Sequence, residues 1–346
     1  MTLCRRDLKP AMWCEFEAIG RKANTMRAGP GKISVRKFMQ GESLPLRIFF
    51  LKQFLAERPD KFNNFTGLRS PHADFFFIFM NTKITFLGTG NALVTKCYNT
   101  CFALQDAGDT FLTDAGGGNT ILAQLEKADI SVSSIRHLFL THGHTDHILG
   151  VIWIIRLAAS LYTRGKHPGL TIFCHDECEQ KLRAFCQMTL TAKLQAVLDN
   201  GIKFVRLTNG EAFQAGPFHA TAFDILSTKT KQFGYRLILP DGKILVCLGD
   251  EPYNPACLAY AKKADYLLSE AFCLYGEREK FKPYEKHHST ALDAARVARE
   301  LSAKNLILYH TQDNNLSARK ALYTAEAKKE FAGAIYVPDD LESLEI

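Results

Sequence analysis

The sequence lacks the features of an exported or membrane-inserted protein. Its first residues include Arg5, Arg6 and Lys9, but no apolar core and no small-residue cleavage site, so we expect no secretory signal peptide. No apolar run reaches the roughly 18 residues that indicate a membrane-spanning helix. None of the 10 cysteines forms a CxxC pair, which favours reduced packing thiols over a disulfide framework. We therefore expect a cytoplasmic protein without a membrane partner.

Nucleotide-binding signatures are also missing. The pattern predicts a strand over Lys83–Leu87 that ends in a tight turn, Gly88–Ala92, but neither GxGxxG nor GK[ST] follows it.

The 346 residues are 47% hydrophobic and 23% charged, as in an ordinary globular protein with one large domain or two modest ones. Predicted strands and helices alternate from residue 82 to residue 336, which indicates a layered α/β fold.

Charge is unevenly distributed along the chain. Residues 1–79 contain 14 basic residues (Lys and Arg) and 7 acidic residues (Asp and Glu). Residues 80–346 contain 29 basic and 29 acidic residues. The basic residues of 1–79 are not interleaved with its Phe clusters, as a nucleic-acid-binding stripe would require. We interpret 1–79 as a basic, poorly ordered N-terminal extension and 80–346 as the functional domain. The alternative is a basic arm that binds nucleic acid or an anionic surface.

Four ligand-type side chains gather in one short loop between a predicted buried strand, 135–140, and a predicted buried helix from residue 148. They are His142, His144, Asp146 and His147. In an extended segment His142 and His144 point to the same side. Asp146 and His147 come where the chain turns, and they can reach a second ion beside the first. Three imidazoles and a carboxylate suit zinc, with Mn²⁺ or Fe²⁺ as competitors. A solvated polar turn is the alternative, but it does not explain this density of ligands.

This loop matches the HxHxDH motif of the metallo-β-lactamase superfamily of two-metal hydrolases, and residues 80–346 resemble the ribonuclease Z branch of that superfamily. The resemblance implies an αββα sandwich, in which two mixed sheets lie face to face with helices outside. It also implies a metal-dependent hydrolase, most similar to a phosphodiesterase, with two zinc ions per chain at the edge where strand-end loops meet.

The resemblance extends to further metal-site residues. Asp250 would bridge the two ions with one oxygen to each, and His310 would complete the second ion with Asp146 and His147. Asp114 would lie just outside the ligands and orient a ligand histidine through a hydrogen bond. The alternative for Asp114 is the N-cap of a helix over 119–127.

The resemblance also implies a catalytic pair. His288 would donate a proton to the leaving oxygen, supported by Glu270, while Asp146 would orient the attacking water or take its proton. Ser289 or Thr290 suits the N-cap of the following predicted helix, which would fix His288 at the mouth of that helix.

One expected ligand is missing. Counting back from the FGY tripeptide at 233–235, the third histidine of the first metal site would fall near Thr228, and the segment 224–229 contains no histidine. His219 could replace it only if the backbone were rearranged. A lone histidine next to a phenylalanine, as His219 is to Phe218, is more often a structural residue than a metal ligand. We therefore expect a first site that is more open and binds its ion more weakly.

The substrate is predicted from what the chain omits. Ribonuclease Z enzymes that process tRNA carry a long arm between the GY strand and the bridging aspartate, whereas only residues 236–249 separate Tyr235 from Asp250 here. The balanced charge of 80–346 also disfavours a broad tRNA footprint. We therefore predict a small or short phosphodiester rather than pre-tRNA. Local basic residues that could hold one phosphate are Lys229, Lys231, Lys280, Lys282 and Lys286.

Two other functions stay open on the sequence alone. The fold also hosts enzymes that cleave lactones, thioesters or amides. A non-catalytic protein with a degraded first metal site is the second alternative. Separately, the protein could form a homodimer.

Overall fold

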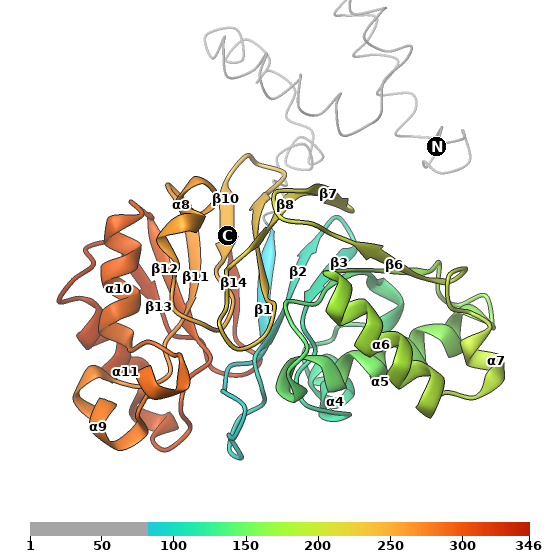
Figure 1. Cartoon of the computed structure of the whole chain (residues 1–346), viewed down its shortest axis with the longest axis horizontal. Coiled ribbons are helices and arrows are strands. Elements are labelled where there is room, and N and C mark those ends of the chain that lie inside the picture. Colours follow the sequence, from blue (N-terminus) through green and yellow to red (C-terminus); the bar gives the residue numbers. More distant parts are fainter. Residues whose placement is uncertain (1–81) are drawn as a thin grey trace, which may run out of the picture. The chain divides into compact units, whose positions relative to one another are not determined.

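The computed structural model describes residues 82–346, which form two seven-stranded β-sheets (Figure 1). The prediction for residues 1–79 lies outside the described residues. The first sheet has the order β14-β1-β2-β3-β4-β5-β6 and the second the order β13-β12-β11-β10-β9-β8-β7. The strands of the first sheet are β1 (Lys83–Gly88), β2 (Cys101–Asp106), β3 (Asp109–Thr113), β4 (Ile135–Phe139), β5 (Leu170–Cys174), β6 (Ile202–Arg206) and β14 (Ser343–Glu345). Those of the second are β7 (Ala212–Ala215), β8 (Phe218–Asp224), β9 (Phe233–Ile238), β10 (Ile244–Cys247), β11 (Tyr266–Glu270), β12 (Asn305–Tyr309) and β13 (Ala334–Tyr336).

The strands have two apolar faces because the sheets are covered on both sides. Along β2, Phe102 packs in the core between the sheets, while Ala103 packs in the core beneath the helices. Large aromatic side chains fill the space between the sheets. The Tyr235 ring of the second sheet lies 5.7 Å from Phe111 and 4.9 Å from Phe139 of the first, both edge to face. These contacts hold the two sheets together.

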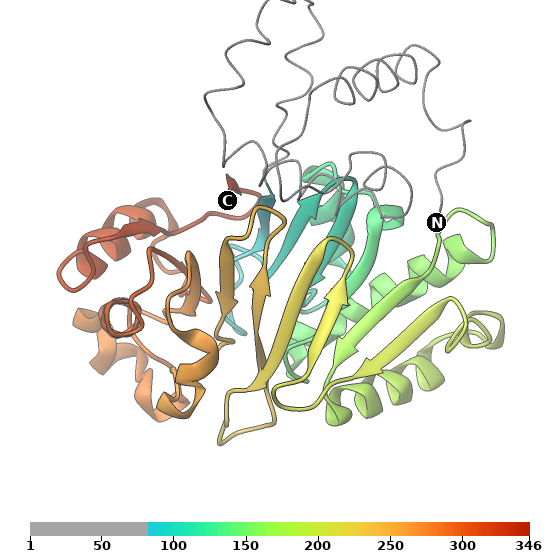
Figure 2. The same cartoon turned by 90° about the horizontal axis from the view of Figure 1, so that it is seen from above.

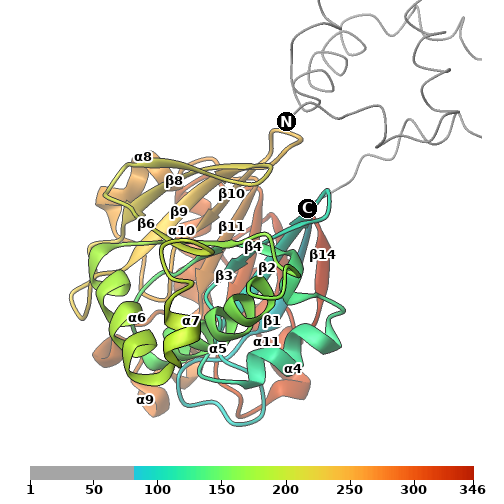
Figure 3. The same cartoon turned by 90° about the vertical axis from the view of Figure 1, so that its right-hand side faces the viewer.

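Helices cover the outer faces of both sheets (Figures 1–3). The first sheet carries α4 (Thr120–Lys127), α5 (Thr145–Tyr162), α6 (Asp176–Thr189) and α7 (Ala192–Gln195). The second carries α8 (Leu258–Ala261), α10 (Ala291–Glu300) and α11 (Leu316–Ala327), with the short α9 (Arg278–Phe281) in the connection before α10. Short 3₁₀ turns are η3 (Val132–Ser134), η4 (Pro255–Cys257), η5 (Tyr275–Glu277) and η6 (Tyr284–Lys286). The predicted αββα sandwich is confirmed.

The helix α5 is the central helix over the first sheet. By length and composition alone it could cross a membrane, and it is the one helix within residues 82–346 that passes this test. Its apolar character has a different cause, because Ile148, Val151, Ile155 and Ala158 are buried in the core beneath the helices. Gly150 allows the helix to approach the loop after β3, since a Cβ atom there would lie 1.7 Å from the carbonyl oxygen of Ala115.

The described cysteines are packing residues. All eight of them carry free thiols, and seven are buried, with Cys97 intermediate. This agrees with the expectation of reduced thiols in this part of the chain.

Parallel strands bring the candidate site residues to one edge of the sandwich. In the first sheet β3 to β6 run parallel, and in the second β10 to β13 do so. The carboxyl ends of such strands meet at a common edge, where α/β proteins usually bind their ligands. Asp114 follows β3, residues 141–147 follow β4, Asp250 follows β10, Glu270 ends β11 and His310 follows β12.

Candidate metal centre

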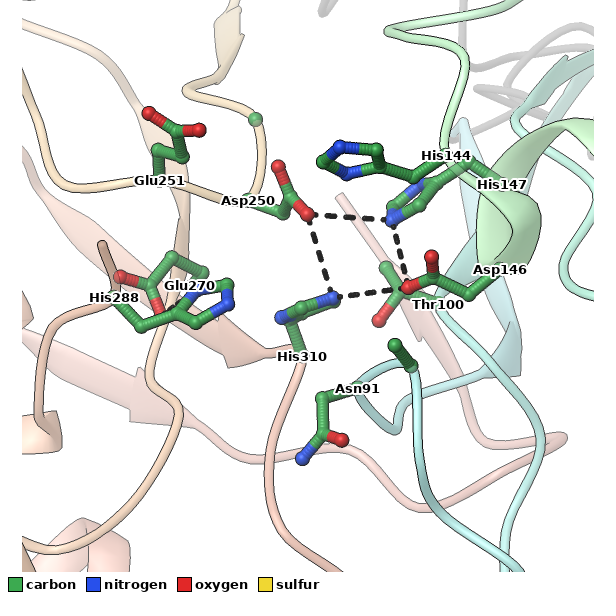
Figure 4. A network of polar contacts seen from close by, with 12 residues as sticks. Asn91, Thr100, His144, Asp146, His147, Asp250, Glu251, Glu270, His288 and His310 are labelled. Carbon is green, nitrogen blue, oxygen red and sulfur yellow. Dashed lines mark ion pairs between the residues drawn. The ribbon is translucent and has the colours of Figure 1, made fainter. Parts of the chain in front are cut away.

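Three imidazoles and two carboxylates converge at one site, and Figure 4 shows four of these residues, Asp146, His147, Asp250 and His310. The Nε2 atoms of His142, His147 and His310 each lie 3.5 Å from Oδ2 of Asp250. Oδ2 of Asp146 lies 3.3 Å from His147 Nε2 and 3.5 Å from His310 Nε2. All five side chains are buried. Residues far apart in the sequence therefore present their ligand atoms to one small volume.

The donor atoms form two groups that suit divalent ions. One consists of His142, His147 and Asp250, and the other of Asp146, His147 and His310, with the atoms of each group within 4.8 Å of one another. The Nε2 atoms of His147 and His310 are buried and have no hydrogen-bond partner. Burying an unpaired polar nitrogen costs free energy, whereas imidazole nitrogens and carboxylate oxygens together are a common zinc ligand set. The arrangement therefore fits metal ions better than a self-sufficient hydrogen-bond network.

The electrostatics of the described residues favour cation binding. Burial opposes ionisation of Asp146, but the adjacent His147 and His310 outweigh it and hold its pKa below the ordinary value. Burial likewise opposes ionisation of Asp250, and His142 is the main group that lowers its pKa well below normal. Burial lowers the pKa of His142 well below its ordinary value. In contrast, two carboxylates, Asp146 and Asp114, overcome burial and raise the pKa of His147, so a cation can take the place of that proton.

Asp114 supports the loop that carries the histidines. Its Oδ1 accepts a hydrogen bond from the Thr141 backbone N–H at 2.8 Å, and its Oδ2 accepts one from the Thr141 hydroxyl at 2.8 Å. Oδ2 also lies 2.7 Å from His147 Nδ1, which turns Nε2 of that ring towards Asp146 and Asp250. The N-cap position of α4 belongs to Asn119 instead. The alternative of a helix cap for Asp114 is therefore wrong.

Two site residues occupy left-handed backbone conformations at the ends of their strands. Asp114 has φ 53° and His310 has φ 57°. Such conformations are uncommon outside glycine, although Asp and His adopt them more readily than most residues, and they concentrate at functional sites. Both residues thus turn the chain sharply where β3 and β12 end.

The structure brings His144 beside His142 but has no histidine at the position expected for the third ligand of the first site. His144 is half-buried at the N-cap position of α5, and its Nδ1 lies 2.8 Å from His142 Nε2, so both rings face the same side as expected. Thr228 stands where the third histidine was expected, and it is exposed, with its hydroxyl 2.9 Å from His287 Nδ1. His219 is exposed on β8 and belongs to none of the ligand groups found within 82–346.

A residue that sequence reasoning missed is Gln232. It is fully buried, and its Nε2 donates a hydrogen bond to Asp250 Oδ1 at 2.5 Å. The carboxylate of Asp250 thus turns a single oxygen, Oδ2, to the histidines, in contrast to the expected one oxygen per ion. A lone glutamine in a polar stretch carries no periodic signal that could have revealed this contact.

The expected catalytic pair is close but not directly bonded. Nδ1 of His288 lies 3.7 Å from Glu270 Oε2, beyond hydrogen-bond distance. The Glu270 carboxylate instead accepts the backbone N–H groups of Phe272 at 3.1 Å and Ser289 at 2.5 Å. The His288 ring stacks on Phe272 at 4.6 Å and lies 5.2 Å from the His310 ring. Glu270 therefore fixes the backbone next to His288 rather than the ring itself.

The pair carries opposite pKa shifts. Burial lowers the pKa of His288 to about 3, and burial raises the pKa of Glu270 to about 8.

The following helix begins as expected, since Thr290 caps α10 in a reciprocal pair of hydrogen bonds with Asp293.

Two loops meet beside Glu251, the residue after Asp250. The ammonium of Lys229 donates a hydrogen bond to the backbone carbonyl of Lys286 at 2.8 Å and lies 3.8 Å from Glu251 Oε1. Glu251 also accepts a hydrogen bond from the Ser227 hydroxyl at 2.7 Å. With the contact between Thr228 and His287, these bonds join the loop before β9 to the loop before α10.

Comparisons with known proteins agree with this architecture. A ribonuclease Z from Methanothermobacter thermautotrophicus is 28% identical over 306 residues, which cover 76% of this chain and 96% of that protein. The metallo-β-lactamase fold protein YhfI from Bacillus subtilis superposes with a TM-score of 0.63 at 20% identity, over 77% of this chain and 100% of YhfI. The short form of human tRNase Z superposes with a TM-score of 0.60 at 20% identity, over 76% and 99%.

These findings confirm the predicted superfamily and its ribonuclease Z-like branch. Residues 82–332, most of the chain, match the family model described as Anti-Pycsar protein Apyc1. The chain therefore belongs to the Anti-Pycsar protein Apyc1 family of metallo-β-lactamase fold proteins.

Proposed function

We propose that this protein hydrolyses a small or short phosphodiester with the help of two divalent metal ions. The proposed ion is zinc, with Mn²⁺ or Fe²⁺ as competitors, and the proposed ligands are His142, His144, Asp146, His147, Asp250 and His310. The observation that carries this proposal is the pair of buried, unpaired Nε2 atoms on His147 and His310, which face shared carboxylate oxygens. The similarity to a ribonuclease Z supports a phosphodiester over a lactone, thioester or amide.

The metal ions would supply a water of near-neutral pKa and neutralise charge on the phosphate. The chain's own residues then have separate tasks. Asp146, between His147 and His310, orients the attacking water and accepts its proton. Asp114 holds the His147 ring in one orientation, so that Nε2 faces the ions.

His288 is the proposed proton donor to the leaving oxygen. Because burial lowers its pKa to about 3, this role requires the anionic phosphate of the bound substrate to raise that pKa. Its ring lies beside His310, and the stack on Phe272 restricts its rotation. Glu270 anchors Ser289, the next residue, through a short hydrogen bond. The pair thereby keeps an imidazole beside the metal ligands, where a leaving group would depart.

The leaving group itself provides the test. The p-nitrophenolate ion leaves without protonation, whereas an alkoxide needs an acid. We expect His288→Ala to lower kcat on an alkyl phosphodiester by about 10²–10⁴-fold and to change turnover of bis-p-nitrophenyl phosphate much less. His287→Ala removes the adjacent, exposed histidine and serves as the matched control. Equal losses on both substrates would exclude the acid role of His288, and faster turnover of lactones or thioesters by the wild type would exclude the phosphodiesterase.

Two features support a small substrate. Strands β9 and β10 are joined by residues 239–243 alone, and this short connection supports the expected lack of an arm before Asp250. The Lys229 ammonium bonds the Lys286 backbone carbonyl, and the Lys286 ammonium lies 5.2 Å from the Phe272 ring, so each could contribute to holding a single phosphate. Cleavage of a pre-tRNA at a rate equal to that of short diesters would contradict this part of the proposal. A cytoplasmic location remains our expectation, and sedimentation analysis would distinguish a monomer from a homodimer.

A further inference from the structure

The amide of Gln232 joins the segment that lacks the third histidine to the shared carboxylate Asp250. Gln232 directly precedes β9 and is fully buried. Its Nε2 donates to Asp250 Oδ1 at 2.5 Å, while its own Oε1 is buried without a hydrogen-bond partner. An apolar residue of similar size would avoid the unpaired Oε1 but would leave Oδ1 of the buried Asp250 without this donor. The amide is therefore costly as a packing residue, which points to a role at the site.

The hydrogen bond from Gln232 gives the two carboxylate oxygens of Asp250 different partners. Oδ1 is engaged by Gln232, and Oδ2 lies 3.5 Å from Nε2 of each of His142, His147 and His310. Without Gln232 the carboxylate could rotate and offer its two oxygens separately. With Gln232 in place, the same oxygen belongs to both metal positions.

The surrounding backbone is arranged to permit this contact. Gly249 has φ 84°, and a Cβ atom there would lie 2.8 Å from Gln232 Nε2, so any other residue would be strained and would also displace the amide. The Tyr309 hydroxyl donates to the Gly249 carbonyl at 2.5 Å and fixes this turn. The Phe233 backbone N–H donates to the Thr141 carbonyl at 3.0 Å, which ties the segment to the loop that carries the histidines.

We propose that Gln232 is a positioning residue that compensates for the missing third histidine by clamping Asp250, so that one carboxylate oxygen serves both metal ions. The inference rests on the proposed function only in requiring that the site binds metal. Because the ions share this oxygen, the binding of one pre-orients a ligand of the other, and the two binding steps are coupled.

The test is a metal titration that does not depend on turnover. Metal-free wild type, Gln232→Leu and Gln232→Asn are titrated with Zn²⁺ in competition with a chromophoric chelator. Asn retains the amide but is one methylene shorter, so it cannot reach Asp250. We expect both variants to bind zinc about 10- to 100-fold more weakly than the wild type, with two resolved steps in place of coupled binding.

Gln124→Leu is the matched control. Gln124 is another buried amide, and its Nε2 donates to the Leu87 carbonyl at 2.6 Å. This variant should lower the melting temperature but retain wild-type zinc affinity. If the Gln232 variants bound both ions within about 2-fold of the wild type, the clamp would be disproved while the metal site stood. A wild type that took up no zinc would overturn both the clamp and the proposed function.

Discussion

The side chain of Asp114 offers the sharpest test of how this site is supported. It accepts hydrogen bonds from the backbone and hydroxyl of Thr141 and contacts His147 Nδ1, all within 2.8 Å. Asp114→Asn preserves the shape of the side chain, and asparagine tolerates the left-handed φ of 53°. The change replaces one acceptor oxygen with an NH₂ group. That group cannot accept a hydrogen bond from His147.

The expected loss follows from the tautomer of the His147 ring. If the NH₂ group faces Nδ1, the ring must carry its proton on Nε2, the atom that faces Asp146 and Asp250. A protonated Nε2 cannot bind a metal ion. Changes to residues that orient a ligand histidine weaken metal affinity by about 10- to 100-fold. Each tenfold step corresponds to about 1.4 kcal/mol.

The assay compares zinc affinity with the stability of the metal-free protein. Asp340→Asn is the matched control, because Asp340 also accepts a threonine hydroxyl and a backbone N–H, from Thr89 at 2.7 Å and Tyr98 at 2.6 Å, and contacts no ligand histidine. In the metal-free state we expect both variants to have a lower melting temperature than the wild type. We expect only Asp114→Asn to bind zinc more weakly. Unchanged affinity in Asp114→Asn, or equal losses in both variants, would refute the reasoning.

Three further outcomes can be measured. Gly150→Ala should destabilise the protein by about 1–3 kcal/mol or more through the clash with Ala115, whereas Gly118→Ala, in open space, should not; equal melting temperatures would contradict the packing at α5. Chelation should lower the melting temperature, and zinc at 100 times its Kd should restore about 2.7 kcal/mol; a midpoint insensitive to zinc would argue against a resident metal. Lys229→Ala should raise KM for a phosphodiester about tenfold with little change in kcat, because one charge-assisted hydrogen bond is lost; the exposed Lys193→Ala should not, and equal effects would remove Lys229 from the site.

The fold was largely predictable because its strands carry continuous apolar runs between clear turn residues. The strands predicted over Lys83–Leu87 and 135–140 each differ by one residue from β1 and β4. The ligands from His142 to His147 were identifiable because they are close together in the sequence. The helix begins at Thr145 rather than at residue 148, so Asp146 and His147 lie in the first turn of α5 and not in the predicted loop. The dependence of these ligands on Asp114 could be anticipated only through the resemblance, since nothing in the local sequence links the two.

The contacts that sequence reasoning missed depend on how distant segments dock. Gln232 meets Asp250 only because β9 and β10 pair, and a polar residue before a strand gives no hint of this. The separation of Glu270 from the His288 ring is a matter of ångströms, which no pattern encodes. The left-handed conformation of His310 is likewise set by the turn after β12, not by its neighbours in the sequence.

The ligand atoms come from both halves of the sandwich, with His142, Asp146 and His147 after β4 and Asp250 and His310 after strands of the second sheet. During synthesis the first three emerge from the ribosome well before the other two. A nascent chain therefore holds an incomplete chelate until the second sheet has closed on the first. The proposed ions could therefore be fully bound only after the two halves have assembled, so that metal loading would come late in maturation.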